Sequence, residues 1–217
     1  MLPTMARYRL FISAVSSEFE RARDLLAASL RAREMDIAVQ SDFVQHDDTT
    51  LRLCLNNLAG LLFDTSRFGE AEPLMLRALA IDEPSLGKDH PRVATDLNNL
   101  ASLLRAINRR GDAEPLYRRA LAIDEASFGK DHPTVARDLN NLAMLLQDTN
   151  RLGDAKPLMR RHPAIFLAFQ RDTGHAHPHR DAAIGNYAAL LTAMGKSEAE
   201  IGAALAALHR EAGLDEA

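Results

Sequence analysis

The sequence has no tryptophan, and aromatic residues make up only 5% of its 217 residues. Aromatic platforms on which bases stack are therefore scarce. An excess of positive charge is also absent, because the formal net charge is −4. This charge gives no electrostatic reason for binding to DNA, RNA or an anionic membrane. We therefore expect neither nucleic acid nor a membrane as a partner.

The chain contains one cysteine, Cys54, so an internal disulfide cannot form. The start of the chain, MLPTMARYRLFISAV, contains a short apolar run, but it continues into SSEFER without a clear small-residue cleavage site, which favours a strand over a signal peptide. No apolar segment has the length needed to cross a bilayer, and no G-x-x-x-x-G-K-[ST] sequence indicates a P-loop. These absences together predict a cytoplasmic protein.

Two stretches of the chain are nearly identical. GKDHPRVATDLNNLASLLRAINR at 87–109 and GKDHPTVARDLNNLAMLLQDTNR at 129–151 match at 17 of 23 positions. Paired asparagines recur with the same spacing, at 56–57, 98–99 and 140–141. A fixed period of this size is typical of repeat architectures, in which stacked units bury faces that a single unit leaves exposed.

Each unit is expected to contain two helices. Asp-His-Pro at 89–91 is a helix start, because proline is tolerated in a first helical turn. Apolar residues then follow at helical spacing over 93–104, and the polar run at 108–111 ends this first helix. The second helix continues to Gly129.

The phrases L-N-N-L-A and A-E-P-L-x-x-R-A-L-A-I, with alanines at recurring places in both helices, resemble the tetratricopeptide repeat of the 42-residue kinesin-light-chain-like type. The resemblance covers about residues 50–217 and is weaker in the last unit. It implies a mainly α protein, a right-handed superhelix of helix pairs whose concave groove binds peptide segments. The domains expected are a segment at 1–48 and a repeat array at 49–217, with units at about 49–90, 91–132, 133–177 and 178–217.

The third unit departs from the pattern. His162 replaces a small alanine, and Pro163 replaces a leucine. Proline inside a helix costs about 3 kcal/mol and forces a kink or break, so we predict a distorted helix near these residues. A hinge or an altered groove end is one interpretation, and tolerated sequence drift is the favoured one.

The first 48 positions do not repeat. An apolar run at 8–15, a helix that begins with the capping box Ser17–Glu20, and a second run at 36–43 predict a short parallel βαβ segment. This segment resembles the start of the TIR-like domain of bacterial STAND signalling ATPases. The later strands of that family are missing, and with them any catalytic acid. Self-association through the exposed strand edges is an open alternative.

The second asparagine of each pair is the candidate binding residue. In tetratricopeptide proteins the matching position faces the groove, and an amide there can grip an extended backbone by donating and accepting hydrogen bonds. Arg137, one turn earlier in the third unit, is the single cation at its position. The first asparagine of each pair is expected to tie neighbouring helices together. The predicted groove residues are Asn57, Asn99, Asn141, Asn186 and Arg137.

Histidines and the cysteine provide weaker candidates. His175, His177 and His179 alternate in GHAHPHR, but their spacing matches no standard metal site, so a solvated loop is favoured. His90 recurs at a helix start and is expected to be structural. Cys54 is expected to be a small apolar residue rather than a nucleophile.

The sequence therefore predicts a protein–protein interaction scaffold for a protein or peptide ligand, without catalytic residues, metal or cofactor. Two alternatives remain open. The chain is a signalling or anti-phage effector component whose TIR-like segment acts only in an assembly, or it is a truncated relic of a STAND-type protein.

Overall fold

The computed structural model describes residues 10–13, 37–40 and 48–214. The chain divides into two compact units, residues 1–82 and 83–217, and each is described by itself. The predicted domain boundary near residue 48 and the four predicted repeat boundaries stay predictions. None of the described helices is long and apolar enough to cross a membrane.

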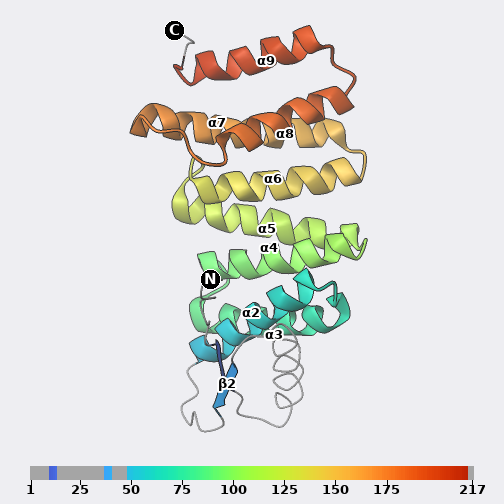
Figure 1. The fold of residues 1–217 in the computed structure, drawn as a ribbon, viewed down its shortest axis with the longest axis vertical. Helices are drawn as coiled ribbons and strands as arrows, with labels where there is room; N and C mark the ends of the chain where they lie inside the picture. The colour runs from blue at the N-terminus through green and yellow to red at the C-terminus, as the bar shows by residue number, and fades with distance from the viewer. Residues whose placement is uncertain (1–9, 14–36, 41–47, 215–217) are drawn as a thin grey trace, which may run out of the picture. The chain divides into compact units, whose positions relative to one another are not determined.

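The chain is mainly helical, as predicted, and Figure 1 shows the helices of the second unit layered in chain order from α4 to α9. Each layer turns back on the previous one, which is the arrangement expected of helix-pair repeats. The helices are α2 (Asp48–Asp64), α3 (Phe68–Leu86), α4 (Pro91–Ala106), α5 (Arg110–Phe128), α6 (Pro133–Asp148), α7 (Leu152–Thr173), α8 (Arg180–Ala193) and α9 (Glu198–Glu211).

Two short strands precede the helices in the first unit. The strands β1 (Leu10–Ser13) and β2 (Ile37–Gln40) pair in parallel, with Leu10 opposite Ile37. The helix that the sequence predicts between them lies outside the described residues. The βαβ segment as a whole, and its likeness to a TIR-like domain, therefore stay predictions.

Histidine caps begin the helices α4 and α6. His90 Nδ1 accepts a hydrogen bond from the backbone N–H of Arg92, and His132 Nδ1 accepts one from Thr134, both at 3.1 Å. Each cap satisfies an amide that has no partner within its helix, and the following proline fits the first turn. The predicted structural role of these histidines is confirmed.

The turns inside the helix pairs repeat as closely as the helices do. Ser66, Asn108 and Asn150 occupy the same place in successive repeats, and all adopt a positive φ, of 59°, 66° and 57°. Asparagine tolerates this left-handed conformation better than most residues with a side chain. The polar run that the sequence marks as a break is therefore a tight turn of constant geometry.

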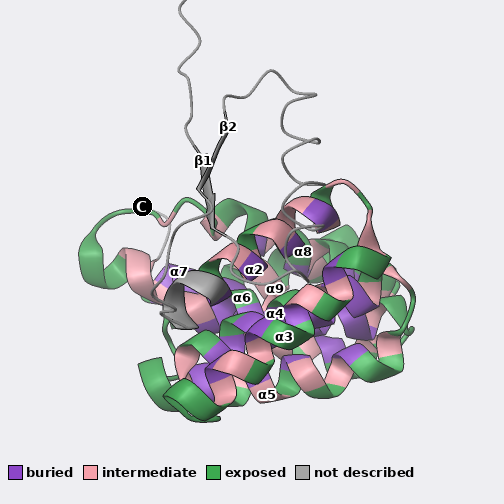
Figure 2. Ribbon diagram, turned by 90° about the horizontal axis from the view of Figure 1, so that it is seen from below, coloured by how far each residue is buried: buried purple, intermediate pink, exposed green. Residues whose placement is uncertain are grey.

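Alanines lie where the helices of a pair approach each other. Buried and exposed residues alternate along the helices (Figure 2), and the alanines of the first three pairs are among the completely buried residues. A larger side chain there would push the helices apart. The fourth pair is different, because Ala188 is only half-buried and Ala199 is exposed. The six buried alanines are Ala59, Ala71, Ala101, Ala113, Ala143 and Ala155.

The helix α7 contains the two residues that depart from the repeat pattern. It runs without a break from Leu152 to Thr173, through both His162 and Pro163, and both of these residues are buried. Proline lacks the amide hydrogen that would bond to the carbonyl of Met159. The helix continues with this bond missing, so the proline does not break it. The predicted distortion of the helix near these residues stays a prediction.

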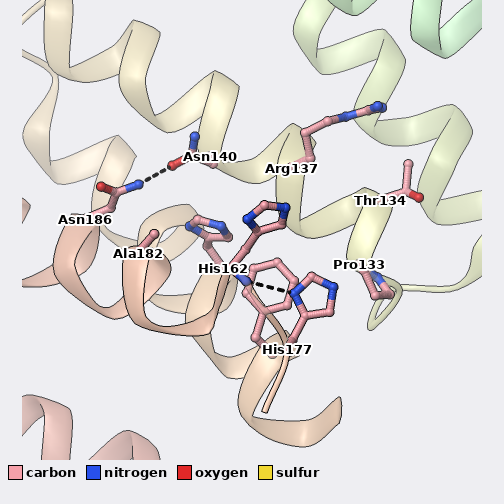
Figure 3. A pocket seen from close by; sticks show the side chains of 10 residues that line it. Pro133, Thr134, Arg137, Asn140, His162, His177, Ala182 and Asn186 are labelled. Atoms are coloured by element: carbon pink, nitrogen blue, oxygen red, sulfur yellow. Dashed lines mark hydrogen bonds between the residues drawn. The ribbon is translucent and has the colours of Figure 1, made fainter. Parts of the chain in front are cut away.

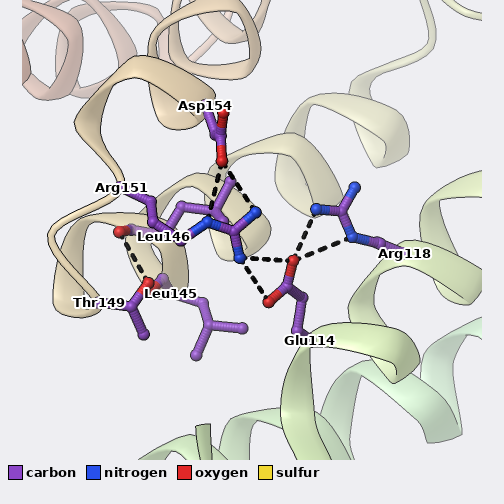
Figure 4. Close-up of polar contacts among 7 residues, drawn as sticks. All are labelled: Glu114, Arg118, Leu145, Leu146, Thr149, Arg151 and Asp154. Atoms are coloured by element: carbon purple, nitrogen blue, oxygen red, sulfur yellow. Dashed lines mark hydrogen bonds and ion pairs between the residues drawn. The ribbon is translucent and has the colours of Figure 1, made fainter. Parts of the chain in front are cut away.

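Ion pairs connect consecutive pairs on the surface of the second unit. Arg151, at the start of α7, contacts Glu114 of α5 and Asp154 of its own helix, both at 2.8 Å (Figure 4). Arg118 contacts the same glutamate at 2.6 Å. The hydrogen bond from Arg118, followed by that from Arg151, lowers the pKa of Glu114 despite its partial burial. Such exposed pairs contribute little stability singly but help to fix the register of the helices.

Candidate functional site

Asn98 and Asn99 have opposite environments. The Asn98 side chain is only 4% exposed, and its Nδ2 donates to Asp138 Oδ1 at 2.8 Å, which ties α4 to α6. Asn99, its neighbour in the chain, is exposed. The predicted tie between neighbouring first helices is confirmed for Asn98. The second asparagine is left on the surface because successive helical residues point about 100° apart.

The remaining candidate asparagines are also accessible. Asn57 and Asn186 are exposed, and Asn141 is half-buried. In the last helix pair Asn186 Nδ2 donates to Asn140 Oδ1 at 3.0 Å, so this candidate has an internal partner. A groove lined by the candidate asparagines stays a prediction.

Arg137 is half-exposed and is held by buried carboxylates. Its Nε and Nη2 each lie 3.1 Å from Asp138 Oδ1, and its Nη2 lies 3.5 Å from Asp124 Oδ2. Asp138 is fully buried and Asp124 is 1% exposed. The guanidinium is therefore not a free cation, because it compensates two carboxyl groups at the junction of α5 and α6.

The Asp124 carboxyl is the most strongly perturbed acid of this network. Burial, followed by the hydrogen bond to Asp138 and the charge of Asp138, raises its pKa from 3.8 to about 7, against an opposing effect of Arg137. When both carboxyls are deprotonated, Asp124 Oδ1 and Asp138 Oδ2 have no hydrogen-bond partner among the described residues. A proton shared between the two carboxyls satisfies this pair, since two adjacent buried carboxylates cannot both ionise easily.

A pocket of about 470 Å³ lies between α6, α7 and the start of α8. Figure 3 shows Arg137 and the hydrogen-bonded Asn140–Asn186 pair, which are polar residues that line the pocket. Aromatic and imidazole rings form the rest of the wall. The lining residues are Pro133, Thr134, Arg137, Asn140, His162, Phe166, His177, His179, Ala182 and Asn186.

Comparison of the repeats explains why the pocket lies at this junction. The junction of α7 and α8 is compared with that of α5 and α6 by aligning their sequences. The helices α5 and α7 are aligned at the repeat period, and α6 and α8 are aligned on His-Pro at 132–133 and 177–178. The charged residues of the earlier junction are absent at the later one, where alanines stand in place of the arginine and one aspartate. Of these alanines, Ala182 lines the pocket, whereas Ala183 is fully buried. Asp124 corresponds to Phe166, Arg137 to Ala182, Asp138 to Ala183, and Ala120 to His162.

The histidine loop is not uniformly solvated, which corrects the expectation from the sequence. The His177 ring stacks on Phe166 with a centroid distance of 4.4 Å and an interplanar angle of 17°. Its Nδ1 accepts from the backbone N–H of His179 at 3.2 Å. His175 is exposed, as expected. The loop thus supplies a half-buried ring to the pocket wall instead of three free ligands.

His162 completes this wall from within α7. It is 6% exposed, and its ring meets Phe166 edge-on at 5.4 Å. Burial, followed by the nearby charge of His179, lowers the pKa of His162 from 6.5 to about 4, so the ring is neutral at pH 7. Burial also lowers the pKa of His177. Nowhere in the described part of the chain do three or more His, Cys, Asp or Glu side chains form a cluster that could hold a metal ion.

A family model described as tetratricopeptide repeat matches residues 51–126 and 111–168, which together span more than half of the chain. This chain belongs to the tetratricopeptide repeat family. Proteins of this family are generally scaffolds rather than enzymes, and they generally bind protein or peptide partners. The match begins after the strands, so it does not bear on the segment at 1–48.

Solved tetratricopeptide structures resemble this chain in fold. One is BtubC (BKLC) from P. vanneervenii, with 22% identity and a TM-score of 0.65 over 91% of this chain and 72% of the other. Another is a Podosopora anserina protein of kinesin-light-chain type with nearly identical TPR-like repeats, with 19% identity and a TM-score of 0.63 over 89% and 86%. No curated protein matches the chain in sequence.

Sequence reasoning missed the pocket of this tetratricopeptide array. It treated the change of alanine to His162 as drift, and it treated the histidine loop as a separate feature. The repeat alignment contained the missing signal, because Ala182 stands where Arg137 stood and Phe166 where Asp124 stood. These changes concern one junction, which only a comparison across both helices reveals.

Proposed function

We propose that the chain is a protein-interaction scaffold that binds a peptide or helical segment of a partner protein in a concave groove formed by its repeats. Its membership of the tetratricopeptide repeat family supports this function. In this proposal residues 49–217 form the array. The groove residues are Asn57, Asn99, Asn141, Asn186 and Arg137.

The observation that carries the proposal is the contrast between Asn98 and Asn99. The Asn98 side chain makes an internal hydrogen bond, whereas the next residue, Asn99, is exposed. Asn57, Asn99 and Asn186 are exposed at matching places of the first helices, and Asn141 is half-buried there. Accessible amides at these places would present a donor and an acceptor at regular intervals. A peptide backbone offers the complementary groups at any sequence. Such a row favours backbone contacts over the recognition of particular side chains.

Arg137 adds a cation to this row. Because Asp138 and Asp124 hold the guanidinium, its position is fixed before a partner arrives, which reduces the entropy lost on binding. Its charge is largely compensated, so the groove is expected to attract acidic segments only weakly.

The test is the substitution of Asn99 and Asn141 together by alanine. A partner captured by the wild-type chain from a native lysate is identified by mass spectrometry, and its bound segment is then titrated by fluorescence anisotropy. Each lost amide contact is expected to cost about 1 kcal/mol, so the double variant should bind about tenfold or more weakly.

Ser85 and Ser127 provide the matched control. They are exposed polar residues at equivalent places of α3 and α5, and their replacement by alanine should leave the affinity unchanged. Circular dichroism should show equal helicity in all three chains. Equal affinity of the correctly folded Asn99/Asn141 variant and the wild type would contradict the proposal.

The effector alternative is not proposed. It depends on residues 7–50, most of which lie outside the described residues. The parallel pairing of β1 and β2 agrees with it but is common to many α/β folds.

A further inference from the structure

We propose that the pocket between α6, α7 and α8 is a binding site for an aromatic ring that carries a hydroxyl group, a phenol-type ligand. The pocket shares Arg137 and Asn186 with the proposed groove, but neither Asn99 nor Asn141 lines it, so the test of the groove at those two residues does not alter the pocket.

The size and the lining of the pocket suit such a ring. A volume of about 470 Å³ lies within the range of small-molecule sites, about 300–1,000 Å³. Phe166 is only 3% exposed and is stacked against His177, so the more accessible rings of His177 and His179 are the ones that an incoming ring can contact. Aromatic pairs in offset or edge-to-face contact gain free energy beyond their burial.

The buried polar group of the pocket selects the hydroxyl. His162 is only 6% exposed, yet its Nδ1 has no hydrogen-bond partner among the described residues. An unpaired buried polar atom is costly, and such an atom in a folded protein calls for an explanation. The neutral ring has one donor and one acceptor nitrogen, and a hydroxyl can both donate and accept. The ring forms part of the wall, but Nδ1 itself is enclosed by protein atoms. The proposal therefore includes a half-turn about the Cβ–Cγ bond, which exchanges the sides on which Nδ1 and Cδ2 lie.

The charges around the pocket argue against an ionic ligand. None of the described lining residues is acidic, and the one permanently charged side chain among them, Arg137, is already paired with Asp138 and Asp124. An anion would have to compete with these buried carboxylates for the guanidinium. A neutral ring leaves that network intact.

The same conclusion follows from how the pocket arises in the repeat. At the earlier junction, Arg137 and the carboxylates of Asp124 and Asp138 occupy the equivalent positions. At the later junction Ala182 and Ala183 correspond to Arg137 and Asp138. His162, which has a polar ring, corresponds to Ala120. Loss of a filling side chain together with gain of a buried, unpaired imidazole is the combination expected of a binding site.

The experiment uses p-cresol and toluene, which share a ring and a methyl group and differ in the hydroxyl. Each is titrated into the full-length chain with ¹⁵N-labelled histidine, and the imidazole resonances are followed by long-range ¹H–¹⁵N correlation. We expect saturable shifts at His162 and His177 with p-cresol, little change at the exposed His175, and at least fivefold weaker binding of toluene. Absence of saturation, or equal binding of the two compounds, overturns the proposal.

Two variants complete the test. His162→Phe keeps a ring and removes both nitrogens, so p-cresol should lose its advantage over toluene. Ala182→Arg restores the side chain found at position 137 and should abolish the binding of both compounds. Because Ala182 is exposed, this variant is expected to fold even where the first does not. Binding of p-cresol that survives Ala182→Arg also overturns the proposal.

The source of the ring is decided by a third pair of probes, the capped tripeptides acetyl-Gly-Tyr-Gly-amide and acetyl-Gly-Phe-Gly-amide. Tyrosine-selective binding at least as tight as that of p-cresol assigns the ring to a partner polypeptide. Binding of p-cresol alone assigns it to a free small molecule. Failure of the Asn99/Asn141 test leaves these results unchanged, so the two proposals fail separately.

Discussion

Asp124 shows how one residue sets a pH dependence at the junction of α5 and α6. Its pKa is raised, so the folded chain holds its proton more tightly than the unfolded chain does. The contribution of this proton to stability is complete below the unfolded pKa of 3.8 and is lost as the pH rises through about 7. His162 acts in the opposite sense, because its lowered pKa reduces stability as the pH falls from 6.5 towards 4.

Replacement of Asp124 by asparagine tests this account. The asparagine amide can donate a hydrogen bond to the Asp138 carboxylate at any pH, whereas the Asp124 carboxyl can donate one only when it is protonated. The variant should therefore gain stability relative to the wild type as the pH rises from 5 to 8. Since one pKa unit corresponds to about 1.4 kcal/mol, the gain should reach about 2–4 kcal/mol. Thermal unfolding at several pH values measures the difference in unfolding free energy between the variant and the wild type. Titratable groups that the two proteins share contribute equally to both and cancel in this difference.

The control is Asp89→Asn, which makes the same change of side chain at an exposed position of the loop before α4. A constant difference for Asp124→Asn would show that the carboxyls do not share a proton.

The helix α7 shows at the element scale how a local rule is overridden. Pro163 removes a backbone hydrogen bond, yet the helix continues and buries the residue. The helix thus gives up local stability at the place where His162 enters the pocket wall. Strain and loss of stability at functional sites are common, because the surrounding structure compensates for them.

Reversion of both residues to the repeat pattern, His162→Ala with Pro163→Leu, should stabilise α7 by about 1–3 kcal/mol. Urea unfolding should show a higher midpoint, and the p-cresol shifts should vanish. The reciprocal change, Ala120→His with Leu121→Pro, places the same pair in α5. It should lower the midpoint, because no pocket there accommodates the ring. A lower midpoint for the reversion would mean that the surroundings of α7 are shaped to fit the proline.

Burial declines towards the end of the second unit. The helix α6 buries residues along its whole length, whereas the described residues of α9 include one buried side chain, Leu208. In a repeat array each element is stabilised by its neighbours, so a terminal helix with little buried surface opens most easily.

Hydrogen exchange followed by mass spectrometry should reveal this gradient. Peptides from α9 are expected to approach full deuteration while peptides from α6 remain protected. The exchange of α8 should be intermediate, since it buries Ala183, Tyr187, Leu190 and Leu191. Equal protection of α6 and α9 would mean that the unit opens only as a whole.

The repeat itself could be predicted from the sequence because its signals are local. The proline of a helix start, the asparagine of a left-handed turn and the alanines of a close approach each act within a few residues of the chain. The tie made by Asn98 was also predictable, since a periodic array places equivalent positions of successive first helices side by side. The continuity of α7 was not, because the propensity of Pro163 says nothing of the packing that holds it.

By itself, the sequence determined the period, the helix pairs and the family of this protein, since each depends on the spacing of residues along the chain. The tertiary structure decided which side chains meet across a junction. It placed Asp124 beside Asp138, turned Arg137 towards both, and enclosed His162 with Phe166 and His177. Pockets and shared protons depend on distances between residues far apart in the chain, and those distances exist only once the helices have packed.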